Sequence, residues 1–425
     1  MIIKKNISNK KSKIAVIGLG YVGFPLAYEF SKKYDLTGFD ISKKRISELK
    51  NGIDKTEEYK KNQILDSKLF LSNDEKDLIN QDIYIITVPT PLEKNNKPNL
   101  KPLISASKTV GKYLSKGSIV IYESTVYPGC TEEDCIPVLE KYSNLKYNLD
   151  FLCGYSPERI NPGDKKRKLT DIIKVVSGSN KEATKIIDNL YKSIIKAGTY
   201  VAESIKVAEA SKIIENVQRD VNISLMNEFA LIFEKLNIDT KEVLDAASTK
   251  WNFLKFKPGL VGGHCIGIDP YYLAYKATKN GYKPKVLLNG RKVNNSIPRS
   301  IVISIEKKAR QIKLDIRSSK ILILGVTFKE NCSDVRNSRV IDLINEFKKI
   351  CTNLSIHDSY ADKEILKKEY GVKLLNQIGE KYDIIVLAVA HKNYLKIDFN
   401  KILNKKHILY DVKSVLPKNI STLRL

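Results

Sequence analysis

A cysteine in a glycine-rich segment is the residue whose surroundings say most about chemistry. Cys265 stands in the run Gly262-Gly263-His264-Cys265-Ile266-Gly267, and Asp269 follows four residues later. The glycines leave the thiol open to a bulky ligand, and an acid one helical turn away lies near it if a helix starts here. A lone cysteine is more often a small core residue. The loop setting with an acid nearby instead favours Cys265 as a nucleophile that reacts as its thiolate.

A second set of polar residues lies in a segment, 201–237, that contains neither glycine nor proline. Its apolar residues recur at helical spacing, which predicts one long helix; two helices with a break near Asn222 are the alternative. Lys212, Asn216 and Arg219 are spaced i, i+4 and i+7, so one face of this helix carries all three. A solvated polar stripe is the more ordinary explanation of that spacing taken alone.

Two further short motifs follow apolar runs. Ser124-Thr125 comes directly after one, and Ser156-Pro157-Glu158-Arg159 stands in a later loop. Each motif taken alone is typical of a helix cap rather than of a site. His264 directly precedes Cys265, but neighbouring side chains in a loop usually diverge, so we do not expect a catalytic dyad.

A glycine-rich loop near the start of the chain predicts a dinucleotide site. Gly18-Leu19-Gly20-Tyr21-Val22-Gly23 follows the apolar run 14–17 and opens a helical pattern. Such glycines allow a tight turn and a close approach of a pyrophosphate, which then sits at a helix N-terminus. Asp40 ends the next apolar run, where a carboxylate accepts ribose hydroxyls and repels a 2′-phosphate. NAD is therefore favoured over NADP, although the cation Arg45 nearby works against that preference.

The elements around these motifs indicate an α/β protein. Apolar runs at 14–17, 36–39, 83–88 and 118–121 predict buried parallel strands, with helical stretches such as 41–50 between them. After Arg317 the pattern returns at 320–324, 354–357, 383–389 and 408–412. We expect two doubly wound, Rossmann-like domains joined by the long central helix. Their predicted spans are 1–200, 201–300 and 316–425, and the long helix also suits a dimer interface.

Composition narrows the class of protein further. The net charge is +25, which raises nucleic acid, an anionic membrane or an anionic small substrate as partners. Lysines are spread along the chain among acids, and the densest cluster, 165–168, is short, so most of the excess is expected to be solvated surface. The apolar stretch 14–28 holds three glycines and a proline and is too short to span a membrane. None of the six cysteines forms a C-x-x-C pair, which argues against a structural zinc site. A chain of this size does not need disulfides, so we expect the reducing cytoplasm.

Taken together, the motifs resemble those of the nucleotide-sugar 6-dehydrogenases, the family of UDP-glucose and UDP-N-acetylhexosamine dehydrogenases. They occur in the family's order along most of the chain. The matching segments are Gly18–Gly23 with Phe24-Pro25-Leu26, Val88-Pro89-Thr90-Pro91, Glu123-Ser124-Thr125, Ser156–Arg159, Ala208-Glu209-Ala210-Ser211-Lys212 with Asn216, Gly262–Asp269 and Gly325–Arg336. The resemblance implies that 1–200 binds NAD, that 201–300 carries the cysteine loop and forms a homodimer, and that 316–425 binds UDP.

The family oxidises the C6 alcohol of the sugar to a carboxylate in two steps with two NAD. By resemblance, the Cys265 thiolate attacks the intermediate aldehyde to give a thiohemiacetal, which becomes a thioester and is hydrolysed by water. Lys212 and Asn216 stabilise the oxyanion, and Asp269 orients Lys212 or the water. The remaining residues that the resemblance assigns are Thr125 and Glu158 around that water and the hydroxymethyl group; Tyr21, Val22, Thr90, Thr125 and Arg336 at the cofactor; and Gly262, Phe328 and Lys329 at the substrate.

The sugar is predicted from the run that follows Glu158. The glucose branch of the family usually has a second acid there, where this chain has Pro162. That run and the Cys265 loop resemble the N-acetylhexosamine branch, which makes uronic acids for capsule and O-antigen. Arg159 and Ile160 are then expected near the sugar, with Arg219 binding substrate. We expect UDP-N-acetylglucosamine or UDP-N-acetylgalactosamine, which differ at C4, with UDP-glucose as the alternative.

Two hypotheses of other kinds compete with this one. A two-electron dehydrogenase of the 6-phosphogluconate or hydroxy-acid type shares the NAD loop and a lysine on a long helix, but it needs neither Cys265 nor the second α/β domain. An NAD-binding module that associates with nucleic acid would use the positive charge. The motifs favour the nucleotide-sugar enzyme, a homodimer that binds no metal or nucleic acid and does not insert into a membrane.

Overall fold

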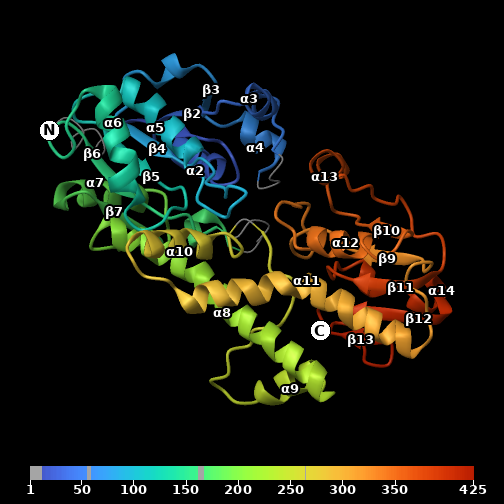
Figure 1. The fold of residues 1–425 in the computed structure, drawn as a ribbon. Coiled ribbons are helices and arrows are strands. Elements are labelled where there is room, and N and C mark those ends of the chain that lie inside the picture. Colours follow the sequence, from blue (N-terminus) through green and yellow to red (C-terminus); the bar gives the residue numbers. More distant parts are fainter. Residues whose placement is uncertain (1–11, 55–58, 161–166, 264) are drawn as a thin grey trace. The chain divides into compact units, whose positions relative to one another are not determined.

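The computed structural model describes residues 12–54, 59–160, 167–263 and 265–425, which form two compact units (Figure 1). The first unit contains the chain up to Glu215 together with Tyr271–Gly281. The second contains Asn216–Pro270 and Tyr282–Leu425. His264, Pro162, Lys165 and Lys166 lie outside the described residues.

The first unit is built around a sheet of eight strands. The strands are β1 (Lys13–Ile17), β2 (Asp35–Phe39), β3 (Phe70–Ser72), β4 (Ile83–Ile86), β5 (Ile119–Tyr122), β6 (Leu152–Tyr155), β7 (Lys174–Gly178) and β8 (Thr199–Val201). Their order is β3-β2-β1-β4-β5-β6-β7-β8, and all neighbours are parallel except β6 and β7. The side chains of β4 and β5 are buried throughout, as expected when helices cover both faces of a parallel sheet.

Helices of this unit connect the strands, and α3 and α7 each begin where a short polar side chain caps the backbone. Ser42 accepts a hydrogen bond from the N–H of Arg45 at 3.2 Å, and Asn180 accepts one from Ala183 at 2.8 Å. The helices are α2 (Gly23–Ser31), α3 (Lys43–Lys50), α4 (Lys61–Leu65), α5 (Lys101–Tyr113), α6 (Ile136–Ser143), α7 (Lys181–Lys192) and α10 (Asp269–Lys279). Shorter helical turns span Glu75–Leu78, Thr131–Cys135 and Leu169–Asp171.

A single long helix, α8 (Ile205–Leu236), runs through 32 residues and contributes to both units. The predicted long helix is therefore confirmed, and the alternative break near Asn222 is wrong. The side chain of Asn222 donates to the carbonyl of Gln218 at 2.7 Å, a bond that follows the helix backbone rather than interrupting it. α8 thus carries Lys212 in the first unit and Asn216 in the second.

The second unit is built around a parallel sheet of five strands. The strands are β9 (Ile321–Leu324), β10 (Leu354–His357), β11 (Tyr382–Leu387), β12 (Leu403–Asp411) and β13 (Leu423–Arg424), in the order β10-β9-β11-β12-β13. The helices are α9 (Thr240–Ala247), α11 (Lys285–Gln311), α12 (Val340–Lys348), α13 (Lys363–Tyr370) and α14 (Phe399–Ile402), with a short helical turn at Tyr394–Lys396. Its core is formed by the buried strands together with α11 and α12.

The predicted fold class of two doubly wound α/β sheets joined by a long helix is confirmed. Strands predicted to end at 88 and 389 end earlier, at Ile86 and Leu387. The expected domain limit at 300 falls inside α11, which continues to Gln311. None of the helices in the described part of the chain has the length and apolar character needed to cross a membrane.

Candidate active site

The loop between β1 and α2 has the geometry of a dinucleotide cradle. Gly18 adopts a φ of +94°, and a Cβ at Gly23 would lie 1.8 Å from the carbonyl oxygen of Gly18, so neither position accepts a side chain. At Gly20 an added Cβ would meet nothing within 4 Å, which leaves room for a ligand. The hydroxyl of Thr87 holds the turn by donating to the carbonyl of Gly18 at 2.7 Å. α2 begins at Gly23, so its free N–H groups suit a pyrophosphate.

Asp40 and Arg45 together brace the same loop. Asp40 follows β2, and its Oδ2 accepts the N–H of Leu19 at 2.8 Å. Arg45 donates from Nε to the carbonyl of Leu19 at 2.8 Å and pairs with Asp54 at 3.0 Å. The guanidinium is thus already engaged by protein groups, whereas the carboxylate oxygens of Asp40 keep further lone pairs for ribose hydroxyls. These residues fit NAD better than NADP.

The sheet topology places this loop where α/β proteins bind nucleotides. β1 pairs with β2 on one side and β4 on the other, so the order reverses between β1 and β4. Thr90 and Thr125 follow β4 and β5 at the same edge. The hydroxyl of Thr90 donates to the carbonyl of Thr125 at 2.6 Å, which ties the two segments together.

A buried charged cluster lies behind Glu158. Lys174 on β7 bridges Glu123 at 2.7 Å and Glu158 at 3.2 Å, and all three side chains are buried. Burial raises the pKa of Glu123 to about 7, although Lys174 opposes the shift. Burial lowers the pKa of Lys174, but attraction from Glu123 and Glu158 outweighs it, so the pKa lies above its usual value. Tyr191 donates a short hydrogen bond to Glu123.

Glu158 itself organises the turn that follows it. Its Oε1 accepts the N–H groups of Arg159 and Ile160, each at 2.6 Å, while Lys174 holds the other oxygen. Arg159 pairs with Glu215 on α8, close to Lys212 along the helix. Three hydrogen bonds, from the N–H groups of Arg159 and Ile160 and from the Lys174 ammonium, therefore fix the orientation of the Glu158 carboxylate.

The Cys265 loop ends in the helix that the sequence predicts. α10 starts at Asp269, and the carbonyl of Cys265 accepts the N–H groups of Ile268 at 3.1 Å and Asp269 at 2.9 Å. Cys130, Cys135 and Cys153 are buried, whereas Cys265 is half-buried. The loop thus presents its cysteine directly before a helix.

Asn216 connects this loop to α8. Its Nδ2 donates to Oδ2 of Asp269 at 2.5 Å, and both side chains are buried. The amide nitrogen of Asn216 carries a second N–H besides the one that Asp269 accepts. Asp269 was expected to orient Lys212 or a water; the contact described here is with Asn216.

The glycines before Cys265 lie against the segment that follows β9 in the second unit. A Cβ at Gly262 would lie 2.4 Å from the carbonyl oxygen of Asn337, and one at Gly263 would lie 2.8 Å from the ring of Phe328. Gly263 also donates its N–H to Asn337 at 3.1 Å. The second unit therefore brings the cysteine loop together with the segment that carries Phe328 and Lys329.

Other predicted residues of the second unit are placed individually. The ammonium of Lys329 lies 5.4 Å from the ring centroid of Phe328. Arg336 is exposed and binds Asp334 through two hydrogen bonds of 2.9 and 2.7 Å. Arg219 does not share the burial of Lys212 and Asn216, because α8 turns it toward solvent. The part of Arg219 in substrate binding stays a prediction.

The predicted site residues are divided between the two units. The first contains the glycine loop with Tyr21 and Val22, Asp40, Arg45, Thr90, Thr125, Glu158, Arg159, Ile160 and Lys212. The second contains Asn216, Arg219, Gly262, Cys265, Asp269, Phe328, Lys329 and Arg336.

Several residues with clear structural roles were given no role from the sequence. Glu209 on α8 accepts the N–H groups of Gly129 at 2.5 Å and Thr131 at 2.9 Å, just after Thr125. Asp220 pairs with the buried Arg291 at 2.5 Å. The burial of Lys174 could have been predicted from its position between the apolar pairs 172–173 and 175–176, at the start of β7.

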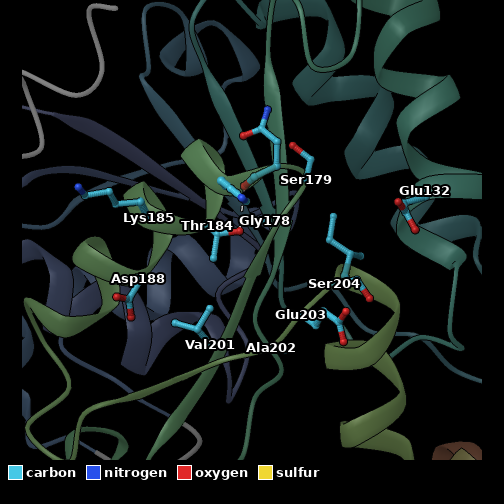
Figure 2. Close-up of a pocket in the computed structure, with 13 residues that line it drawn as sticks. Glu132, Gly178, Ser179, Thr184, Lys185, Asp188, Val201, Ala202, Glu203 and Ser204 are labelled. Atoms are coloured by element: carbon cyan, nitrogen blue, oxygen red, sulfur yellow. Dashed lines mark hydrogen bonds between the residues drawn. The ribbon is translucent and has the colours of Figure 1, made fainter.

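A separate hollow of ≈ 590 Å³ lies beside the start of α7 and the segment that enters α8 (Figure 2). Gly178, Ser179, Asp188 and Glu203 are among its lining residues, and none of the predicted site residues lines it. Within the described ranges, no group of three or more His, Cys, Asp or Glu side chains is arranged to hold a metal ion.

Comparison with known protein families accounts for nearly the whole chain. The NAD binding domain of the UDP-glucose/GDP-mannose dehydrogenase family matches residues 12–195. The central domain of that family matches 206–296, and its UDP binding domain matches 322–418.

Individual relatives agree with this assignment. A UDP-N-acetyl-D-glucosamine 6-dehydrogenase of Salmonella typhi is 50% identical over 97% of this chain and 98% of that protein. Protein CapL of Staphylococcus aureus is 50% identical over 95% of this chain and 96% of that protein. A UDP-D-ManNAc dehydrogenase structure from Pyrococcus horikoshii superposes with a TM-score of 0.87 at 27% identity, covering 97% of this chain and 98% of that one. The chain belongs to the UDP-glucose/GDP-mannose dehydrogenase family and is an NAD-dependent nucleotide-sugar dehydrogenase.

Proposed function

We propose that this dehydrogenase oxidises the C6 hydroxymethyl group of UDP-N-acetylglucosamine to a carboxylate, with Cys265 as the covalent carrier. The observation that carries the mechanism is the Cys265 loop, which ends in Asp269 bound to Asn216. The 50% identity to the Salmonella typhi UDP-N-acetyl-D-glucosamine 6-dehydrogenase supports an N-acetylated sugar. UDP-N-acetylgalactosamine, which differs at C4, is the other candidate within the same proposal.

Bound NAD accepts the hydride of each oxidation. The protein's part is to hold the aldehyde formed first and to prevent its escape. The Cys265 thiolate forms a C–S bond to the aldehyde carbon as the C=O π bond breaks, and the resulting oxyanion takes a proton from the Lys212 ammonium to become the hydroxyl of a thiohemiacetal. After the second oxidation the carbon is a thioester. Water adds to it, the C–S bond breaks, and the carboxylate and the thiolate are released.

The oxygen on the reacting carbon needs donors at each stage. We assign this role to the ammonium of Lys212 and the second N–H of Asn216. Asp269 fixes the Asn216 amide by accepting its other N–H at 2.5 Å. A carboxylate in this position makes Asn216 a donor rather than an acceptor toward the substrate.

Glu158 and Thr125 are proposed to act on water and the hydroxymethyl group. The contacts of Glu158 with Lys174, Arg159 and Ile160 support a fixed carboxylate acceptor. Arg159 and Ile160 then lie beside the sugar, and Arg219 completes substrate binding. Lys329 is assigned to the substrate and Arg336 to the cofactor phosphates, as cations for anionic groups.

We also propose a homodimer and the three-domain division at 1–200, 201–300 and 316–425. α8 carries exposed apolar residues at spacings of seven and four, which lie on one helical face. Leu225 is 43% exposed, Ile232 45% and Leu236 58%. An apolar face of this kind is typical of a surface that a partner covers. A cytoplasmic location and a role in capsule or O-antigen synthesis stay predictions.

The substrate is tested with purified enzyme, NAD and four UDP-sugars: N-acetylglucosamine, N-acetylgalactosamine, N-acetylmannosamine and glucose. We expect the highest kcat/KM for UDP-N-acetylglucosamine and two NADH per sugar. Activity on UDP-glucose alone would defeat the N-acetyl assignment. One NADH per sugar, with the aldehyde as product, would favour two-electron chemistry instead.

A further inference from the structure

Within the second unit, the carboxyl ends of β9, β10 and β11 lie at a point where the strand order reverses, and α/β sheets bind nucleotides in the crevice at such a point. β9 pairs with β10 on one side and β11 on the other, so the strand order reverses at β9. The segment 326–331, which contains Phe328 and Lys329, follows β9. Asp358 follows β10, and His391 follows β11. Three loops therefore converge where a ligand of this sheet is expected.

His391 lies at the point where these loops meet. Its side chain is fully buried. Its Nδ1 accepts the N–H of Asn331 at 2.8 Å, and its Nε2 lies 3.1 Å from Oδ2 of Asp358 and 3.2 Å from Oγ1 of Thr327. Because a backbone N–H can only donate, Nδ1 must be the unprotonated nitrogen, and Nε2 carries the proton.

Asp358 holds the start of the same loop. Its Oδ2 accepts the N–H of Val326 at 2.6 Å as well as the bond from His391. The hydroxyl of Thr327 donates to the carbonyl of Lys329 at 2.8 Å, which leaves it as an acceptor for Nε2 of His391. Each donor in this network thus has an acceptor.

Of His391, Asp358 and Thr327, only His391 binds Asn331, at the end of the segment 326–331. Asn331 has a φ of +55°, a conformation that non-glycine residues rarely adopt, and its N–H is held by Nδ1. The carboxamide of Asn331 in turn accepts the N–H of Lys392 at 3.0 Å. The ring of Tyr360 stacks on the imidazole with centroids 4.7 Å apart.

We propose that His391 is a positioning residue for nucleotide binding: through Nδ1 it fixes the segment that carries Lys329 at the mouth of the crevice. The role rests on the proposed function, in which this unit binds the UDP part of the substrate. His391 touches neither the reacting carbon nor Cys265 in this account. Its loss should therefore weaken binding of UDP and raise KM for the UDP-sugar, while KM for NAD stays unchanged.

Three substitutions separate positioning from general stability. In His391→Asn the side-chain amide replaces the Nδ1 position and can still accept from Asn331. In His391→Gln the amide replaces Nε2 and keeps the contacts with Asp358 and Thr327. His391→Leu removes both. His407→Asn is a matched control, because that histidine bonds only locally to the carbonyl of Asn404 at 2.8 Å.

UDP itself is the probe, titrated calorimetrically into the full-length enzyme, with NAD titrated in parallel. We expect His391→Leu and His391→Gln to weaken UDP binding by about tenfold or more, as loss of a buried hydrogen bond does. His391→Asn should stay within about threefold of the unsubstituted enzyme, and NAD affinity should change by less than about twofold in every variant.

Other results overturn the role in distinct ways. Equal UDP affinity in all variants, or Asn and Gln variants that weaken together, removes the Nδ1 role. If the Leu variant loses NAD binding as well, its fold has failed and the Asn–Gln comparison decides. An unsubstituted enzyme that does not bind UDP would remove the proposed function and this role with it. Nitrogen-15 spectra of labelled histidine give a second check: a protonated Nδ1 on His391 contradicts the assignment.

Discussion

Asn216 and Asp269 form a buried hydrogen bond of 2.5 Å that joins α8 to the first residue of α10. The two residues are 53 positions apart in the chain, and Cys265 lies one turn before Asp269. The bond fixes which atom of the Asn216 amide faces Asp269, because only the amide nitrogen can donate to a carboxylate. It also ties the position of the cysteine loop to the long helix.

Asp269→Asn should lower kcat by about 10²–10³-fold, because the new amide no longer forces Asn216 to present an N–H to the substrate oxygen. KM for NAD should not change. Steady-state kinetics on the UDP-sugar measures both quantities. Asp245→Asn, at an exposed position of α9, is the matched control. A loss of activity that appears equally in the control would contradict the specific role of Asp269.

Asp40→Asn should weaken the discrimination against NADP by about tenfold, because a charge that repels the 2′-phosphate is removed while the hydrogen-bonding shape is kept. The ratio of kcat/KM for NAD and NADP measures the effect. An unchanged ratio would show that the carboxylate does not face the ribose.

Arg45→Ala tests whether Arg45 holds the glycine loop through the carbonyl of Leu19 or receives the 2′-phosphate of NADP. Its guanidinium binds Leu19 and Asp54, so its removal should raise KM for NAD about fivefold through a looser loop. Activity with NADP should not fall more than activity with NAD. A selective loss of NADP activity would mean that Arg45 receives the 2′-phosphate after all.

Glu209 should make stability depend on pH. Burial raises its pKa from 4.5 to about 7, although the N–H groups of Thr131 and Gly129 oppose the shift. The folded chain thus holds the Glu209 proton where the unfolded chain has lost it. Its stabilising contribution is complete below pH 4.5 and falls as pH rises through about 7, by about 3 kcal/mol at most.

Glu209→Gln should remove that part of the slope. The urea midpoints of the unsubstituted protein and the variant, measured between pH 5 and 8, give the difference directly. Parallel pH profiles for the two proteins would show that Glu209 keeps an ordinary pKa. The same comparison at Glu203, an exposed acid beside α8, should show no difference in slope.

Ile232→Glu should dissociate the proposed homodimer, because it places a charge in the exposed apolar face of α8. Light scattering after gel filtration measures the mass of the particle. Asn345→Glu adds the same charge at an exposed position of α12 and should leave the mass unchanged. A monomeric unsubstituted protein, or a dimer that survives the Ile232 substitution, would contradict this use of the α8 face.

The apolar strands and the glycine loop could be predicted from the sequence because each leaves a local signal. Runs such as 14–17 and 321–324 are buried on both faces, and the spacing of glycines and Asp40 defines the cradle. The strands β8 and β13 have three and two residues, too few for a pattern. β7 was not predicted, because its first residue, Lys174, is charged and breaks the apolar run around it.

The contacts of the candidate site were harder to predict from the sequence, because they join residues that are far apart in the chain. Lys174 and Glu123 are 51 positions apart, and their pairing depends on how β5 and β7 lie in the sheet. Helical spacing placed Arg219 with Lys212 and Asn216. Burial depends on what packs against each turn of α8, and there Arg219 is exposed. The bonds of His391 likewise depend on three loops meeting at one sheet edge.

The central claim is that Cys265 carries the substrate between the two oxidations. Cys265→Ser removes the thiolate but keeps a similar shape and should leave NAD binding intact. A single-turnover reaction with NAD and UDP-N-acetylglucosamine, followed by NADH absorbance and intact-protein mass spectrometry, tests this directly. We expect the variant to stall at an aldehyde-level or covalent intermediate, with less than two NADH per sugar. Full four-electron turnover by Cys265→Ser, with uronate released at the unsubstituted rate, would contradict it.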